Sequence, residues 1–264
     1  PVEYNSVDVN NKGFIYATQK KNASAKSVKK LNFSGDDILK REGIHPIMGD
    51  LVDKSEVRSQ FVDIAARKYG IYSILDNSRS RIFTYNANGN LLYIFGGKGS
   101  REGLIKNGVA IETIGKRIIV VDSGLERITV YKPTPYVQYI HKAIKSYNLG
   151  YYQKSKEMWQ KVNKYNTNYE MAYRGMGRSF FRENNFYQAM KYFKKGNDRS
   201  NYSKVFSEYR TKIIRNNINL ILTILLLILL LMFFVYKFSI INNIKEKLFI
   251  AGGSINKVEG KKIT

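Results

Sequence analysis

Residues 218–236, INLILTILLLILLLMFFVY, limit what this chain can fold into more than any other stretch. The run holds no charged residue, and only Asn219 and Thr223 interrupt its apolar character. A helix of this length spans about 28 Å, close to the ~30 Å hydrocarbon thickness of a bilayer. A buried core helix rarely extends this far without a polar face, and a secretory leader would stand near the N-terminus. The segment is therefore predicted to be a transmembrane helix.

Basic residues are concentrated just before that segment. Lys and Arg outnumber Asp and Glu by 21 to 14 in residues 1–132, by 17 to 5 in 133–217 and by 6 to 2 in 218–264. Anionic headgroups attract juxtamembrane Lys and Arg by roughly 1 kcal/mol each, and salt screens the attraction. We expect contact with anionic lipid headgroups or with an anionic polymer of the cell wall. Nucleic acid is the competing partner, but the modest excess in residues 1–132 argues against it.

The sequence offers little for catalysis or metal binding. It has no cysteine, which excludes disulfides, thiolate metal sites and cysteine nucleophiles. The two histidines, His45 and His141, lack any companion at metal-ligand or triad spacing, so each is interpreted as a surface or boundary residue. We expect no cofactor and no catalytic residue.

The first 133 residues contain a repeat of short strands. Residues 70–99 hold three apolar runs separated by polar turns, and the pattern returns at 116–133 with a spacing of 46 residues. The repeat matches Asp76 to Asp122, Arg81 to Arg127 and Tyr85 to Tyr131. A less regular copy covers residues 13–39 at an offset of 54. Repeats of this length built from short strands are typical of propeller blades.

These residues resemble the NHL-type repeat, in which an apolar strand ends in Asp and a turn leads to Arg and a second strand. Asp76, Arg81, Phe95-Gly96, Asp122 and Arg127 carry the resemblance. About three blades fit, whereas closed propellers have at least four. Because the sequence begins at Pro1 without Met, we expect either that blades are missing from the N-terminus or that the sheet closes in an unusual way.

Related lactonase-like propellers hold a metal in the central channel, and a propeller hydrolase of that kind is the alternative function. No set of metal ligands in this sequence matches that channel. Asp76 and Asp122 are interpreted instead as turn residues that accept backbone hydrogen bonds and pair with Arg81 and Arg127. The glycines of residues 96–100, GGKGS, lack phosphate-loop spacing and are interpreted as a turn between blades.

After Pro133 and Pro135, aromatic and small residues recur at helical spacing. Residues 172–196 resemble a tetratricopeptide repeat, and a weaker copy stands 34 residues earlier. We expect Gly177 and Ala189 to let two helices approach closely. The groove between those helices would be filled by Phe180 and Phe193.

The order of these parts resembles bacterial NHL-repeat membrane proteins in which a multi-span Yip-type domain follows, most clearly in residues 188–210. That resemblance implies a protein partner, namely a carbohydrate transport system. No second span follows residue 236.

We therefore predict a multidomain chain in which all-β propeller-like blades precede an α-helical tetratricopeptide-like segment and one transmembrane helix. The predicted parts are NHL-like blades (1–133), two tetratricopeptide-like hairpins (134–198), a basic juxtamembrane helix (199–217), the span (218–236) and a short tail (237–264). The predicted function is a membrane-anchored, non-catalytic binding or scaffolding protein. A nucleic-acid-binding propeller in the cytoplasm is a further alternative.

Membrane-surface contact is assigned to the basic residues of the helical part: Lys191, Lys194, Lys195, Arg199, Lys204, Arg210, Lys212 and Arg215. Flanking charge does not orient the span. Lys204, Arg210, Lys212 and Arg215 precede it, and Lys237, Lys245 and Lys247 follow it. We expect the strand repeats to lie on the extracytoplasmic side of the cell membrane, with loops of the propeller face contacting the partner.

Overall fold

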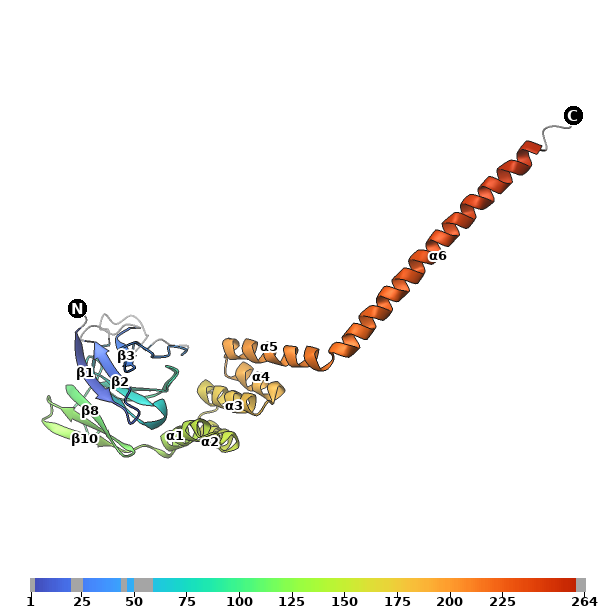
Figure 1. Ribbon diagram of the computed structural model, residues 1–264. Helices are drawn as coiled ribbons and strands as arrows, with labels where there is room; N and C mark the ends of the chain where they lie inside the picture. Colours follow the sequence, from blue (N-terminus) through green and yellow to red (C-terminus); the bar gives the residue numbers. More distant parts are fainter. Residues whose placement is uncertain (1–2, 20–25, 44–46, 50–58, 260–264) are drawn as a thin grey trace. The chain divides into compact units, whose positions relative to one another are not determined.

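The computed structural model describes residues 3–19, 26–43, 47–49 and 59–259 (Figure 1). His45 lies outside them. The chain divides into two compact units, Pro1–Val205 and Phe206–Thr264. In the described part, the first unit holds three antiparallel sheets and then helices, and the second holds the long C-terminal helix.

The strands come in three groups that follow the chain. The first sheet consists of β1 (Tyr4–Val9), β2 (Ile15–Gln19) and β3 (Val28–Leu31). The second consists of β4 (Phe61–Ala66), β5 (Tyr72–Asp76), β6 (Arg81–Tyr85) and β7 (Leu91–Gly96). The third consists of β8 (Gly108–Ile114), β9 (Arg117–Asp122) and β10 (Arg127–Tyr131). Each strand pairs with its neighbour in sequence, as expected for a meander of tight turns.

The 46-residue repeat corresponds to equivalent positions in the second and third sheets. Asp76 pairs with Arg81 across β5 and β6, and Asp122 pairs with Arg127 across β9 and β10. Both aspartates are buried, and both accept backbone hydrogen bonds in the turn that follows, as predicted. The sequence repeat is therefore a structural repeat.

The predicted ion pair between Asp122 and Arg127 is wrong. The guanidinium of Arg127 donates instead to the carbonyl oxygens of Ser100, Arg101 and Leu104, at 3.4, 2.9 and 2.8 Å. The Asp122 carboxylate accepts four backbone N–H groups, from Lys106, Asn107, Gly124 and Leu125. Burial raises the pKa of Asp122, but these four bonds outweigh burial and hold the pKa below its usual value. The backbone N–H groups thus satisfy the Asp122 carboxylate without Arg127. The Arg127 side chain holds the loop after β7 in place instead.

The three sheets pack face to face, with the second between the other two. One cluster of buried side chains, including Tyr16, Phe61 and Phe83, lies between the first and second sheets. A second cluster, including Leu75, Ile105 and Val120, lies between the second and third. Polar bonds add to this packing: the Asp8 carboxylate of β1 accepts from the backbone N–H of Ala66 at 2.6 Å. Asp63 of β4 likewise accepts from the backbone N–H of Ile111 in β8, at 2.6 Å.

The helical part begins directly after β10. Thr134 caps α1 (Pro135–Asn148) through its hydroxyl, and Pro135 occupies the first turn, where a missing N–H costs nothing. α2 (Tyr152–Tyr165), α3 (Glu170–Arg182), α4 (Phe186–Lys195) and α5 (Arg199–Asn216) follow, coloured yellow to orange in Figure 1. Successive helices pack on one another from α1 to α4.

Close packing in this part depends on small residues at the predicted positions. A Cβ atom on Gly177 would stand 2.9 Å from the ring of Phe193, and Ala189 and Phe193 are fully buried together. Sequence reasoning missed a second contact of this kind, in which a Cβ on Gly175 would overlap the indole of Trp159. Whether the hairpins are tetratricopeptide repeats stays a prediction.

The second unit is dominated by α6 (Ile218–Glu259). Its stretch Ile218–Asn242 is the one helix, among the described residues, that is long and apolar enough to cross a membrane. No part of its most apolar window is buried. The apolar helix thus begins at the predicted residue, Ile218, but extends past residue 236 into the segment predicted as a tail.

Candidate ligand-binding cleft

Two neighbouring cavities open in the first unit where the second sheet, the third sheet and α1 meet. One has a volume of about 380 Å³ and the other about 540 Å³. Arg67, Lys116, Pro133 and His141 line both cavities, so we treat the two as one cleft. The strands supply its floor, and α1 with the linker at residues 132–134 supplies one side.

Arg67 lies at the centre of the cleft, immediately after β4. Its guanidinium donates to the carbonyl oxygens of Lys116 at 3.4 Å and of Arg117 at 3.0 Å, both at the β8–β9 turn. Its Nε is buried and has no acceptor among the described residues. Burial lowers the pKa of Arg67, yet a guanidinium stays protonated in proteins. The cleft therefore contains a permanent, partly desolvated positive charge.

Beside Arg67, Tyr93 of β7 and His141 of α1 join the sheet to the helices. The Tyr93 hydroxyl and the His141 Nε2 are 2.8 Å apart, and the two rings are in contact. Burial, and next the Arg67 charge, lower the pKa of His141 to about 4. The imidazole is thus neutral at pH 7 and shares one hydrogen bond with the phenol. The Tyr169 hydroxyl of the helical part donates to the carbonyl oxygen of Leu92 at 2.7 Å and secures the same junction.

Aromatic side chains line the smaller cavity. Phe95 and Tyr131 meet edge to face, with ring centroids 5.0 Å apart. Tyr136 of α1 and Tyr93 complete this wall, and burial raises the pKa of both hydroxyls. All four rings are partly exposed, so each can offer surface to a ligand.

The charge around the cleft has one sign. Besides Arg67, the lining includes the lysines Lys68, Lys116, Lys132, Lys142 and Lys145, and it includes no Asp or Glu. The adjacent carboxylate of Asp8 accepts from the backbone N–H groups of Val9 and Ala66, so its oxygens are already engaged. Such an arrangement favours an anionic ligand.

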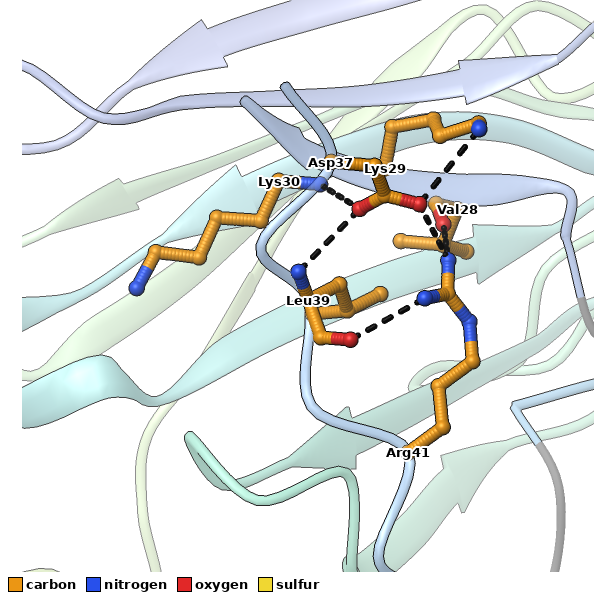
Figure 2. Close-up of polar contacts among 6 residues, drawn as sticks. All are labelled: Val28, Lys29, Lys30, Asp37, Leu39 and Arg41. Atoms are coloured by element: carbon orange, nitrogen blue, oxygen red, sulfur yellow. Dashed lines mark hydrogen bonds and ion pairs between the residues drawn. The ribbon is translucent and has the colours of Figure 1, made fainter. Parts of the chain in front are cut away.

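A second polar cluster stands on the loop after β3 (Figure 2). Asp37 accepts from the backbone N–H groups of Lys30 and Leu39 and from Arg41, which lies 2.8 Å away, and Lys29 approaches to 3.4 Å. Arg41 also donates to the carbonyl oxygens of Val28 and Leu39. Burial raises the pKa of Asp37, but these bonds, that of Arg41 first, hold it below its usual value. The cluster fastens the loop to β3 and has a structural role.

None of the predicted membrane-contact residues lines the cleft. Lys191, Lys194 and Lys195 are exposed on α4, and Arg199 and Lys204 are exposed on the first half of α5. Arg210, Lys212 and Arg215 are exposed in the second unit. At about 100° per residue, Arg199 and Arg210 fall on one side of α5, with Lys204 and Arg215 on another. The eight residues are therefore accessible, but those of α5 do not share one face.

Sequence reasoning missed the cleft. Its residues come from the end of β1, the end of β4 and the segment after it, β7, the β8–β9 turn, the end of β10 and α1, and no local motif contains them. The one signal in the sequence was His141, which was interpreted as a surface or boundary residue. The described residues contain no group of three or more His, Asp or Glu able to hold a metal ion.

No protein-family model matches the sequence, and no curated protein matches it significantly. Among solved structures, virginiamycin B lyase from Staphylococcus aureus is 14% identical over 50% of this chain and 41% of its own, with a TM-score of 0.29. A protein of unknown function from Bacteroides caccae is 14% identical, over 50% of this chain and 47% of its own, with a TM-score of 0.30. The Swd1 β-propeller domain from Myceliophteria thermophila is 10% identical, over 50% of this chain and 54% of its own, with a TM-score of 0.27. The matched part of this chain thus corresponds to about half or less of each of these chains, and likeness at this level carries no argument about function.

Proposed function

We propose that this chain is a single-span membrane protein whose strand repeats and helices form a non-catalytic binding or scaffolding module. The observation that carries the proposal is α6, whose 25-residue stretch Ile218–Asn242 is apolar and wholly exposed. A core helix of a soluble protein would be mostly buried, and a leader would stand near the N-terminus. Exposing an apolar surface of this length to water is unfavourable, whereas the hydrocarbon core of a bilayer stabilises it.

The module's architecture supports binding rather than chemistry. In this proposal the three sheets are NHL-like propeller blades, and α1 to α4 are two tetratricopeptide-like hairpins. Both repeat types commonly present surfaces to other molecules. The cleft between them provides a site for a ligand. The proposed protein partner is a carbohydrate transport complex in a bacterial membrane. The exposed basic residues of α4 and α5 would contact anionic headgroups.

The two other functions have less support. A lactonase-like hydrolase would use carboxylates converging on a metal, but no group of three or more His, Asp or Glu among the described residues could hold one, and the Asp122 carboxylate already accepts four backbone N–H groups. A stabilising shift on adding calcium to the purified chain, with hydrolysis of a lactone, would favour this function. A nucleic-acid-binding role would need the strand repeats on the cytoplasmic side.

Cysteine labelling in intact cells tests the anchoring and the orientation, since the chain has no cysteine of its own. Ser100→Cys lies in an exposed loop of the first unit, and Ser254→Cys lies beyond the apolar stretch. We expect a membrane-impermeant maleimide to label position 100 and not position 254. Labelling of position 254 alone would place the strand repeats in the cytoplasm, and labelling of both positions would contradict a single span.

Alkaline extraction of the same cells provides the anchoring control. The chain should stay in the membrane pellet at high pH, and Leu227→Arg with Leu230→Arg should release it. Two arginines at the centre of a span cost about 5–7 kcal/mol on insertion scales. Release of the unmodified chain would show that α6 does not span the bilayer.

A further inference from the structure

We propose that the cleft binds a small organic anion, with its carboxylate or phosphate group at Arg67 and the neighbouring lysines and its ring against the aromatic wall. This inference rests on the proposed function, since it names the ligand class of the binding module. It depends on the geometry around Arg67, on the chemistry of the walls and on the sign of the surrounding charge.

The Arg67 guanidinium lacks a counter-charge. A guanidinium has five N–H donors, and the structure engages two of them, one through a long bond of 3.4 Å to the carbonyl oxygen of Lys116. No carboxylate of the described residues forms an ion pair with it. A partly buried cation without a counter-ion is costly to keep, and a ligand carboxylate or phosphate would provide both the charge and the missing acceptors.

The walls define the rest of the ligand. Phe95, Tyr131 and Tyr136 offer ring faces and edges, and Ile94 and Val137 add aliphatic surface. The polar pair within the cavity, Tyr93 and His141, already satisfies itself with a bond of 2.8 Å. The smaller cavity therefore favours an aromatic ring, which would pack on its wall, over a polyhydroxylated group. The volume of about 380 Å³ lies in the range of small-molecule sites.

The five lysines extend the positive field to the mouth of the cleft. They raise the local concentration of an anion and speed its entry, and this effect weakens with ionic strength. Lys132, at the linker between β10 and α1, and Lys116, at the β8–β9 turn, both line the smaller cavity and are exposed. Their charges can be removed with little effect on packing.

Calorimetric titration of the full chain in a neutral detergent tests the proposal with four probes. Benzoate and phenyl phosphate combine a ring with an anion, benzyl alcohol has the ring alone, and inorganic phosphate has the charge alone. We expect one or both ring anions to bind at least tenfold more tightly than either partial probe. The preference between benzoate and phenyl phosphate distinguishes a carboxylate ligand from a phosphate ligand. Equal binding of benzyl alcohol, or no binding of either ring anion, would overturn the proposal.

Variants locate the site. Lys132→Gln and Tyr136→Ala should each weaken the ring anion several-fold, and Arg67→Lys should weaken it about tenfold, because a lysine cannot reproduce the guanidinium fork. Arg101→Gln removes an exposed arginine of the same unit outside the cleft and should leave the affinity unchanged. Should Arg67→Lys fail to fold, Lys132→Gln with Tyr136→Ala decides. Binding unaffected by those two variants would place the site elsewhere and overturn the proposal.

Failure here is distinguishable from failure of the proposed function. Cysteine labelling and alkaline extraction report on the span whether or not the cleft is occupied. A chain that is anchored but binds none of the ring anions refutes the ligand class alone.

Discussion

His141 makes the junction between strands and helices sensitive to acid. Its pKa is about 4 in the folded chain against 6.5 for the ordinary side chain, because burial and the Arg67 charge oppose protonation. Between these two pH values the unfolded chain binds a proton that the folded chain rejects. The free energy of unfolding therefore decreases as the pH falls from about 6.5 towards 4, by at most about 3 kcal/mol.

Replacing His141 tests whether this side chain causes the acid sensitivity. His141→Gln can still contact the Tyr93 hydroxyl but does not titrate, so it should flatten the decrease of unfolding free energy across this pH range. Denaturant titrations of the full chain at pH 7, 6, 5 and 4.5 give the slope for each protein. Parallel slopes for the variant and the unmodified chain would show that other groups control the acid response.

Asp63 holds the three sheets together through one carboxylate. Its oxygens accept from the Ile111 backbone of the third sheet and from the Ser6 hydroxyl of the first. Asp63→Ala leaves a buried N–H without an acceptor, and we expect a loss of about 2–3 kcal/mol in unfolding free energy. Glu102→Ala removes an exposed carboxylate of the same unit and should cost under 0.5 kcal/mol. Similar small losses for both variants in denaturant melts would contradict the bridging role.

At the scale of elements, Gly175 is a position where helix propensity and the close approach of α2 and α3 have opposite effects on stability. Alanine favours a helix over glycine by about 1 kcal/mol, but a Cβ on Gly175 would overlap the Trp159 indole. We expect Gly175→Ala to destabilise the chain by about 1–3 kcal/mol in spite of its propensity, because overpacking outweighs it. Gln160→Ala, on the exposed face of α2, should be neutral or stabilising in the same thermal melts. A stabilised Gly175→Ala would mean that α2 and α3 can separate at little cost.

Local patterns predicted the elements well where they repeat. Asp76 and Asp122 stand in equivalent turns because each follows an apolar strand by the same spacing, and such spacing is visible in a single sequence. Gly177, Ala189 and Phe193 meet as predicted, because residues three and four apart share a helix face.

Contacts between distant segments were not predictable in this way. Arg127 follows Asp122 closely in sequence, which suggested an ion pair, yet its partners are carbonyl groups of the loop at residues 100–104. The cleft is a stronger case, since Arg67, Tyr93 and His141 are brought together only by the packing of sheets against α1. Their spacing in sequence carries no signal of that packing.

At the scale of the whole molecule, the first unit and the apolar helix have opposite solvent requirements. Among its described residues, the first unit buries four clusters of apolar side chains and leaves most charged residues exposed. Residues 218–236 of α6 expose an almost uninterrupted apolar surface. In the second unit, Arg210, Lys212 and Arg215 precede the first residue of the apolar helix, Ile218, by eight residues or fewer in sequence. Anionic lipid headgroups would attract these basic side chains.

Nanodiscs of defined lipid composition provide the test of that contact. The full chain with a fluorophore on Ser200→Cys is placed in discs with and without anionic lipid, and quenching by a headgroup-attached quencher is measured. We expect stronger quenching in anionic discs, and a weaker difference when Lys191, Lys194, Lys195 and Lys204 are changed to Gln, since each exposed lysine near the surface contributes about 1 kcal/mol. The matched control changes four exposed lysines of the same unit that do not lie on α4 or α5 to Gln, namely Lys12, Lys98, Lys106 and Lys154. At high salt the difference between the discs should shrink for the unmodified chain, because screening weakens the attraction. Equal quenching in both lipids at low salt would show that the basic residues of α4 and α5 are only a solvated surface.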